Sequence, residues 1–333
     1  MLTAGQNKMT MQKTSPVCTE LISGQLKQVR DFLSACLECS DNRLKPFIDY
    51  IKQQQGKMLR ASVLLLSGQL SGNTNPLHIK IAAVVEMIHA ATLLHDDVID
   101  HGSRRRYQST ANDLWGANFA VLLGDYLLSK AFLSASSAQR NDINRILAET
   151  AETICRGEML QNACRGDFGI SMNEYLGIIE KKTAVFFANC ALLGAVISGA
   201  DKNTCTKLYD FGLNLGIAYQ ILDDLIDIIS TESETGKTTG RDFGSKTPTI
   251  PAIFALSKLS SAGQDELLAL FADKNPDISR IIELLNSVKS IDFTKSQIAH
   301  YQQQAVAALD RLGSDSAVTA LKELTLSATQ IPL

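Results

Sequence analysis

The sequence contains no proline between residues 77 and 247, although seven prolines occur among its 333 residues. Proline in a helix interior removes a backbone hydrogen bond and costs about 3 kcal/mol, so a long interval without it suits long helices. Apolar residues in this interval recur at helical spacing, as in Ile81, Val84, Val85 and Ile88, and strict alternation over strand lengths is hard to find. The missing prolines therefore favour an α-helical central half.

The sequence also lacks a strong net charge and a long unbroken apolar run. Its 32 Lys and Arg against 35 Asp and Glu give a net charge of −3, which excludes the basic field of a nucleic-acid-binding protein. Charged, Gly and His residues interrupt the apolar runs, so we expect no membrane span. Residues 1–15 lack the apolar stretch of a signal peptide and are expected to form a disordered arm. These absences predict a cytoplasmic protein.

The seven cysteines lack the spacing of a metal site. Cys36 and Cys39 form a C-x-x-C pair, but no second pair lies at the distance that a zinc site requires. Two cysteines three residues apart on an amphipathic helix are more often buried thiols than ligands. We therefore expect Cys36 and Cys39 to be buried and to bind no metal.

The sequence does contain a series of helical segments separated by polar or Gly-rich joints, such as 71–75. We find no linker, composition break or short repeat, so residues 16–333 are predicted to form one large all-α domain. The expected helices lie near 16–38, 44–70, 77–101, 112–138, 141–165, 171–199, 203–229, 248–259, 264–273, 277–288 and 294–325.

Two aspartate clusters are the sharpest local signal. They are Asp96-Asp97-Val98-Ile99-Asp100 and Asp223-Asp224-Leu225-Ile226-Asp227. Positions i and i+4 share a helix face, so the outer aspartates of each cluster project together and repel one another. Repelling carboxylates at the end of an apolar helix need a cation, and hard oxygen donors suit Mg²⁺, which also takes phosphate oxygens as ligands. One such cluster could be a solvated helix end, whereas two copies favour a shared metal site.

Basic residues that could bind phosphate oxygens bracket both clusters. They are Lys57, Arg60, Arg104, Arg105, Arg106, Lys181, Lys182, Lys237 and Lys246. Each alone is a weak signal, because a basic residue at a helix end is usually solvated or complements the helix dipole. His89 precedes Asp96 by about two turns on the same face, where it could reach a second diphosphate instead of only filling the core.

The stretch Gly236-Lys237-Thr238 does not form a nucleotide-binding loop. Such a loop needs a glycine where this chain has Thr231, and it should follow a strand instead of a helix. We expect the segment 236–245 to act as a flap over the second cluster.

From about residue 45 to 260 the sequence resembles the trans-isoprenyl diphosphate synthase family. The matching motifs are Gly56-Lys57-x-x-Arg60, His95-Asp96-Asp97-x-x-Asp100, Arg105-Arg106, Leu123-Gly124-Asp125-Tyr126, Gly157-Glu158-x-x-Gln161, Lys182-Thr183-Ala184, Gly216-x-Ala218-Tyr219-Gln220-x-x-Asp223-Asp224-x-x-Asp227, Gly236-Lys237, Gly240-x-Asp242 and Lys246-x-x-Thr249-x-Pro251. The chain departs from the family pattern at Gln55, Ala61 and Tyr107, where family members usually have Gly, Pro and Gly.

The resemblance implies an all-α homodimer of the class I isoprenoid synthase type, a helical bundle around a central cavity. It implies successive head-to-tail additions of isopentenyl diphosphate to an allylic diphosphate such as geranyl, farnesyl or geranylgeranyl diphosphate. It further implies three Mg²⁺ ions per active site, with Asp96, Asp100 and Asp223 as the main ligands and Asp97, Asp224 and Asp227 as support.

The resemblance also divides the remaining polar residues among the substrates. Arg105, Lys182, Lys237 and Lys246 would hold the allylic diphosphate, whereas Lys57, Arg60, His89 and Arg106 would hold isopentenyl diphosphate. Thr183 and Gln220 would face the developing allylic cation.

Product length is expected to depend on Ala91 and Thr92, one helical turn before Asp96. Short-chain members of the family place an aromatic residue at one of these positions, and this chain does not, so it resembles the long-chain octaprenyl-type synthases. The alternative is that Ala91 is small because it packs against a neighbouring helix.

Two other functions remain as alternatives. A class I terpene cyclase shares the fold and the first aspartate motif, but typically replaces the second motif and has little use for Lys57 and Arg60. A non-catalytic subunit that pairs with an active homologue usually loses aspartates, and none is lost here.

Overall fold

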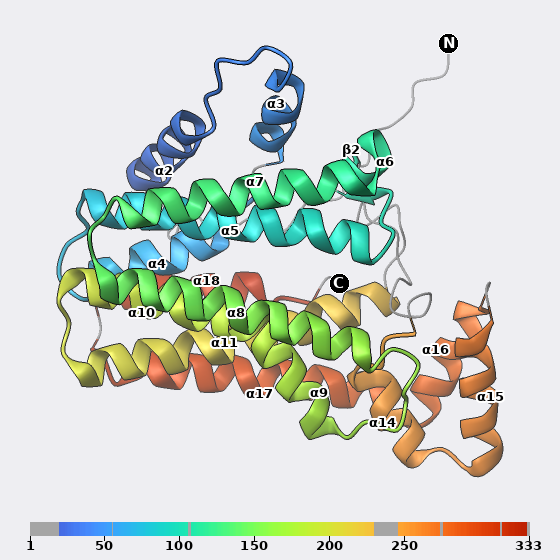
Figure 1. Ribbon diagram of the computed structural model, residues 1–333. Coiled ribbons are helices and arrows are strands. Elements are labelled where there is room, and N and C mark those ends of the chain that lie inside the picture. The colour runs from blue at the N-terminus through green and yellow to red at the C-terminus, as the bar shows by residue number, and fades with distance from the viewer. Residues whose placement is uncertain are drawn as a thin grey trace, which may run out of the picture.

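The computed structural model describes residues 20–54, 56–105, 108–229, 246–273, 276–313 and 315–331. Within them the chain is helical apart from one antiparallel pairing of β1 (Arg104–Arg105) with β2 (Gln108–Ser109), which confirms the predicted all-α class (Figure 1). The helices are α2 (Ser23–Cys36), α3 (Lys45–Gln53), α4 (Leu59–Leu70), α5 (Pro76–Ile99), α6 (Ala111–Trp115), α7 (Ala117–Ser136), α8 (Asn141–Ala163), α9 (Met172–Ile179), the π-helix η1 (Glu180–Ala184), α10 (Val185–Ser198), α11 (Lys202–Ile229), α14 (Ile250–Lys258), α15 (Ser261–Ala272), α16 (Ile278–Ser287), α17 (Ser290–Asp310) and α18 (Ser316–Ala328). The predicted arm over 1–15 lies outside the described residues.

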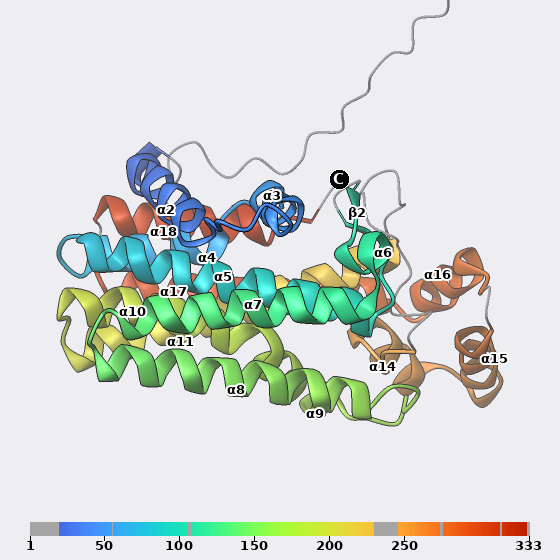
Figure 2. The ribbon, with the colours of Figure 1, turned by 45° about the horizontal axis from the view of Figure 1, so that its top comes forward.

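The long helices pack in layers around α10 (Figures 1 and 2). Helix α10 contains no charged residue and is apolar all round, as expected of a central helix. It contacts α4 and α5 on one side and α11 and α8 on the other, while α7 lies along α5 and α17 along α11. The shorter helices α14, α15 and α16 gather at the end of the bundle where α5 and α11 finish (Figure 1).

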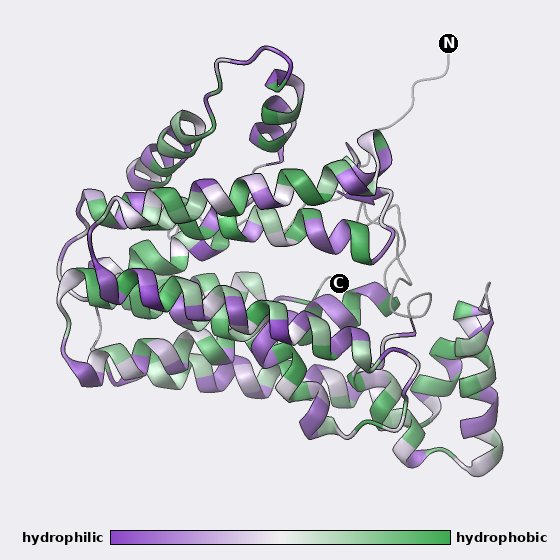
Figure 3. Cartoon of the chain, viewed as in Figure 1, coloured by the Kyte–Doolittle hydropathy of each residue, from purple (hydrophilic) through white to green (hydrophobic). Residues whose placement is uncertain are grey.

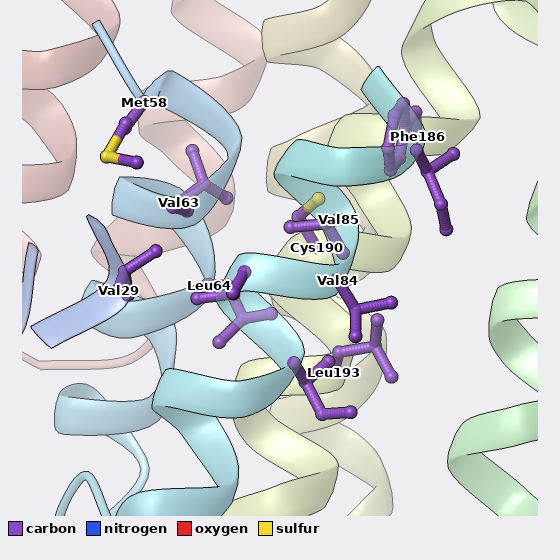
Figure 4. Close-up of a cluster of buried hydrophobic side chains, with 14 of the residues drawn as sticks. Val29, Met58, Val63, Leu64, Val84, Val85, Phe186, Cys190 and Leu193 are labelled. Atoms are coloured by element: carbon purple, nitrogen blue, oxygen red, sulfur yellow. The ribbon is translucent and has the colours of Figure 1, made fainter. Parts of the chain in front are cut away.

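The apolar core between α2, α4, α5 and α10 contains Val29, Leu64, Val84 and Leu193 (Figure 4). Gly194 allows the two backbones of α10 and α4 to approach closely, because a Cβ atom there would lie 2.2 Å from the Leu64 carbonyl oxygen. This contact fixes the position of α4 against α10.

The helix expected at 112–138 divides at Gly116, with φ 85°, into α6 and α7. Two further predicted helices are each divided in two. The segment expected at 44–70 breaks before Met58, whose backbone is left-handed with φ 53°, so that α4 begins at Leu59. The segment expected at 294–325 breaks after Asp310, where Gly313 has φ 103°. In both cases the helical apolar pattern continues across a backbone reversal, and periodicity alone does not reveal the break.

The expectation that no apolar segment could span a membrane was wrong. The helices Pro76–Ile99 and Ala117–Ser136 and the stretch Met172–Ser198 are each long and apolar enough by length and composition. Isolated polar residues interrupt their apolar runs without lowering the mean hydropathy enough to exclude them. In the first and third, 61% of the apolar window is buried in the fold, whereas for α7 the buried share is 33%. Helix α7 therefore presents apolar surface outward.

The prediction that both cysteines of the C-x-x-C pair are buried was also wrong. Cys36 is half-buried at the end of α2, and Cys39 is exposed beyond it, because the helix ends two residues earlier than expected.

Candidate active site

The two aspartate clusters lie at the same end of the bundle, on the last turns of α5 and α11 (Figure 1). Arg105, which follows α5, interacts electrostatically with aspartates of both clusters. Burial opposes the charge on Arg105, yet the nearby carboxylates of Asp97, Asp96 and Asp223 raise the pKa of its guanidinium above the usual value. The fold thus brings together two clusters that are more than a hundred residues apart in sequence.

The middle aspartate of each cluster is buried and already bonded. Asp97 is 3% exposed and accepts hydrogen bonds from Arg105, whose Nη2 lies 2.9 Å from Oδ1. Asp224 is 7% exposed and accepts hydrogen bonds from Tyr175 Oη at 2.5 Å and from Gln220 Nε2 at 2.7 Å. Burial raises the pKa of Asp224 to about 6 despite these donors. Such contacts favour a supporting role for Asp97 and Asp224.

The outer aspartates are less enclosed. Asp223 is exposed, while Asp96, Asp100 and Asp227 are half-buried. The pKa of Asp96 is raised to about 7, chiefly because burial disfavours its charge; Lys182 and Arg105 lower it, whereas Glu158 and Asp100 raise it. A bound cation would relieve this penalty.

The acidic side chains suit a cation that has other ligands as well. Among the described residues, no group of three or more His, Cys, Asp or Glu side chains is arranged to hold a metal ion. The hard carboxylate oxygens fit Mg²⁺, which commonly takes one or two carboxylates and fills its remaining positions with water and phosphate oxygens.

Lys182 and Thr183 lie on the π-helix η1, within a segment predicted to be one regular helix. Two glycines allow η1 to fit between α8 and α11. A Cβ atom on Gly157 would lie 2.4 Å from the Lys182 nitrogen, and one on Gly216 would lie 2.5 Å from the Ala184 Cα. A π-turn holds an extra residue and redirects the side chains that it carries, and it is frequent at functional sites.

The side chains of η1 are held by two groups of hydrogen bonds. Lys182 Nζ lies 2.6 Å from Glu158 Oε2 and also donates to Gln161 Oε1. Burial disfavours the charge on Lys182, but Asp96 and Glu158 raise the pKa above the usual value, so the ammonium stays charged. Thr183 Oγ1 donates to Gln220 Oε1 at 2.6 Å. Gln220 in turn donates to Asp224, which connects η1 to the second cluster.

A second basic group lies at the start of α4. Arg60 is 8% exposed, its guanidinium lies 4.9 Å and 4.6 Å from the ring centroids of Phe186 and Phe187, and its buried Nε has no hydrogen-bond partner within the described chain. A buried cation with an unused donor fits an anion site. Lys57 is exposed, and His89 is half-buried on the neighbouring α5.

Ala61 uses its backbone amide at a position where the family pattern that the sequence resembles has proline. Its N–H donates to Glu86 Oε1 at 2.9 Å and so ties α4 to α5. Proline has no N–H and could not form this bond. Ala61 therefore anchors α4, which carries Arg60, to α5, which carries His89.

Several predicted residues cannot be placed in the site. Arg106, Lys237, the segment 236–245 and two of the departures from the family pattern, Gln55 and Tyr107, lie outside the described residues. Lys246 is exposed, has a left-handed backbone with φ 55° and accepts a hydrogen bond from Gly166 N at 2.8 Å through its carbonyl.

Sequence reasoning assigned no role to Glu158, Gln161, Arg165 or Tyr175. Glu158 and Gln161 are three apart on one face of α8, a spacing that could have suggested a joint partner for a cation. Arg165 contacts Asp100 and Tyr175 contacts Asp224 from 65 and 49 residues away, and no local pattern signals such pairs.

The predicted product-length residues lie where the first cluster meets the core. Ala91 is fully buried, whereas Thr92 is half-buried and donates its hydroxyl to the His89 carbonyl at 2.8 Å. Both side chains are small, and Ala91 faces the interior one turn before Asp96.

Known proteins match most of the chain. Residues 41–288 match the family model described as polyprenyl synthetase. The chain is 30% identical over 266 residues to an octaprenyl diphosphate synthase of Escherichia coli (strain K12), covering 79% of this chain and 82% of that protein. It is 34% identical over 286 residues to a geranylgeranyl diphosphate synthase of Saccharolobus solfataricus, covering 81% and 84%.

Solved structures give the same picture. A polyprenyl synthase of Caulobacter crescentus CB15, complexed with calcium and isoprenyl diphosphate, matches with a TM-score of 0.89 at 30% identity, covering 96% of this chain and 99% of that chain. A decaprenyl diphosphate synthase of Rhodobacter capsulatus matches with a TM-score of 0.88 at 29% identity, covering 95% and 99%.

The raised pKa of Asp96 predicts a pH-dependent cost to the metal-free protein. Between pH 3.8 and about 7 the folded state holds a proton that the unfolded state has lost, so stability falls as pH rises through this window. Asp96→Asn removes the titration and should be about 1–4 kcal/mol more stable than wild type at pH 8, with little difference at pH 4. Urea unfolding in EDTA measures this, with exposed Asp210→Asn as the control. Equal stability of Asp96→Asn and wild type at pH 8 would contradict it.

Proposed function

The chain belongs to the polyprenyl synthetase family, and we propose on that premise that it condenses isopentenyl diphosphate with an allylic diphosphate in a Mg²⁺-dependent reaction. Successive head-to-tail additions to geranyl, farnesyl or geranylgeranyl diphosphate would yield a long trans-polyprenyl diphosphate. The observation that carries this proposal is the pair of aspartate clusters at one end of the bundle, with the cations Arg105 and Lys182 in the field of both.

Asp96 on α5, Asp100 at the C-terminal cap of α5 and Asp223 on α11 are the residues that would hold Mg²⁺, with Asp227 on α11 as a further ligand and three ions in all. Bound Mg²⁺ supplies Lewis-acid neutralisation of the leaving diphosphate. Asp97 and Asp224 would orient these ligands, since each is buried and held by donors from other elements.

The cationic residues would divide between the two substrates. Lys182 and Arg105 would bind the allylic diphosphate, because both lie in the electrostatic field of the outer aspartates. The family resemblance adds Lys246 and Lys237 to this group. Arg60, with Lys57, His89 and Arg106, would bind isopentenyl diphosphate. The buried, unpartnered Nε of Arg60 supports this assignment, since an anion would supply the acceptor it lacks.

The reaction needs no protein nucleophile. The carbon–oxygen bond of the allylic diphosphate breaks, the alkene of isopentenyl diphosphate forms a new carbon–carbon bond, and the departing diphosphate takes the released proton. Thr183 and Gln220 would direct oxygen dipoles toward the allylic cation, since Thr183 donates to Gln220 and Gln220 donates to Asp224, which fixes the orientation of both. A terpene cyclase would need neither the full second cluster nor a second diphosphate site at Arg60.

The proposed reaction is tested with labelled isopentenyl diphosphate and an allylic starter. Wild type should extend the starter with Mg²⁺ and should be inactive in EDTA. Asp223→Asn should lower turnover by at least about 10²-fold, as losing one charge-stabilising group does in other enzymes. Asp210→Asn, on the exposed side of the same helix, is the control. Normal turnover by Asp223→Asn, or release of diphosphate without chain extension, would refute the two-cluster mechanism.

We also propose that the protein is a homodimer that buries the outer face of α7. Large apolar side chains are exposed along this helix and on α8, and Figure 3 shows the apolar stretches of α7. Leu122 is 64% exposed, Leu133 is 67% exposed and Met159 is 72% exposed. An apolar patch of this kind is typical of a subunit interface, and a two-fold dimer buries the same patch of both copies.

The dimer is tested by placing charges on this face. Leu122→Glu combined with Leu133→Glu should convert a dimer into a monomer in light scattering coupled to gel filtration. Leu326→Glu, on an exposed apolar position of α18, is the control and should leave the dimer intact. A monomeric wild type would refute the proposal. Recovery of wild type in the membrane fraction of lysed cells would contradict both this use of α7 and the predicted cytoplasmic location.

The small buried side chain of Ala91 supports a long product. A growing chain that passes down α5 from Asp96 meets Ala91 after about 7.5 Å, the rise of five residues, and one helical turn of about 5.4 Å is comparable to one isoprene unit. A larger side chain at this level would stop growth early.

Ala91→Phe should therefore shorten the product to about fifteen or twenty carbons, because the ring would fill about one helical turn of the space into which the product grows. Chromatography of the dephosphorylated products measures this. Ala90→Phe places the same ring about 100° around the helix and should leave the product length unchanged. An unchanged long product from Ala91→Phe, or a wild type that already stops at twenty carbons, would refute the assignment.

A further inference from the structure

The turn between α8 and α9 carries an arginine that contacts the first aspartate cluster. Arg165 Nη2 lies 2.5 Å from Asp100 Oδ1, and its Nη1 donates to the Ile99 carbonyl at 3.5 Å. The side chains of Arg165 and Asp100 are 26% and 29% exposed. The contact is thus a partly buried ion pair on one of the aspartates that would bind metal.

This turn is anchored on both sides. Gly166, with φ 80°, donates its N–H to the Lys246 carbonyl at 2.8 Å. Phe168 stacks on Phe271, with ring centroids 4.7 Å apart and ring planes 6° apart. Arg165 therefore extends from a fixed backbone. This distinguishes it from a flexible surface arginine, whose ion pairs are worth little because ordering the side chain costs entropy.

We propose that Arg165 is a positioning residue that neutralises Asp100 in the metal-free enzyme and so weakens divalent-cation binding until diphosphate arrives. This inference rests on the proposed function. A cation that binds at Asp100 must compete with the guanidinium or tolerate its positive charge nearby, and both effects lower metal affinity. The phosphate oxygens of the substrate supply negative charge that offsets Arg165, so metal and diphosphate would enter together.

Arg165 differs in this respect from Arg105 and Lys182. Arg105 bonds to Asp97, which is buried and supports its neighbours, and Lys182 pairs with Glu158. Arg165 instead pairs with Asp100, one of the two aspartates that share a face of α5. Removing it should therefore strengthen metal binding, whereas removing a residue that holds substrate would weaken the complex.

The test measures the dissociation constant of Mn²⁺ alone on EDTA-treated protein, from the paramagnetic resonance signal of free Mn²⁺. Arg165→Gln should bind Mn²⁺ about two- to fivefold more tightly than wild type, the range expected for one partly exposed ion pair. Arg165→Met serves as a second neutral variant if the first folds poorly. Arg156→Gln, which removes an exposed partner of Glu152 on α8, should match wild type.

A double-mutant cycle with Asp100→Asn shows whether the gain in Mn²⁺ affinity depends on the ion pair between Arg165 and Asp100. In the Asp100→Asn background, Arg165→Gln should give no further gain in Mn²⁺ affinity. Equal or weaker binding by both neutral variants, or the same gain without Asp100, would overturn the proposal. A wild type that does not extend the chain would refute the proposed function. A wild type that does extend it, with unchanged Mn²⁺ binding in the variants, would refute only the role of Arg165.

Discussion

The mutual repulsion of carboxylates at one end of the bundle is the constraint on which the rest of the site depends. Several carboxyl groups, those of Asp96, Asp100, Glu158 and the second cluster, lie close together, and burial raises the pKa of Asp96 and Asp224, so their charged forms need a cation or a donor. Arg105, Lys182 and Arg165 supply part of the compensating positive charge, and the proposed Mg²⁺ would supply the rest. Because a fully neutralised site would have no use for metal, the incomplete compensation is itself the functional feature.

The fold makes this arrangement possible by close backbone contacts. Glycines on α8 and α11 allow η1 to lie between them, which places Lys182 near the first cluster and Thr183 near the second. The contact of Gly194 with α4 fixes Arg60 against the start of α10 in the same way. Both proposed diphosphate-binding regions are therefore positioned by their contacts with the strongly apolar α10 or with the π-helix that precedes it.

Sequence patterns predicted the parts of this arrangement that are local. The helical class, the shared faces of the aspartates and the grouping of basic residues follow from spacing along the chain. The left-handed Met58 and the π-turn at Lys182 could not be predicted, because the apolar period continues through both. The partners of Asp97, Asp100 and Asp224 depend on tertiary packing. The middle aspartate of each cluster is more buried than the outer ones, a difference that the repeated motif does not show.

The central claim is that α5 and α11 hold metal and diphosphate between them. The most direct test is a crystal structure with Mn²⁺ and inorganic diphosphate, in which anomalous scattering locates the metal. The account predicts Mn²⁺ bonded to Asp96 and Asp100 and further Mn²⁺ bonded to Asp223, with diphosphate oxygens as shared ligands near Lys182 and Arg105. Metal bonded to one helix alone, or diphosphate bound elsewhere with both clusters free of metal, would contradict it.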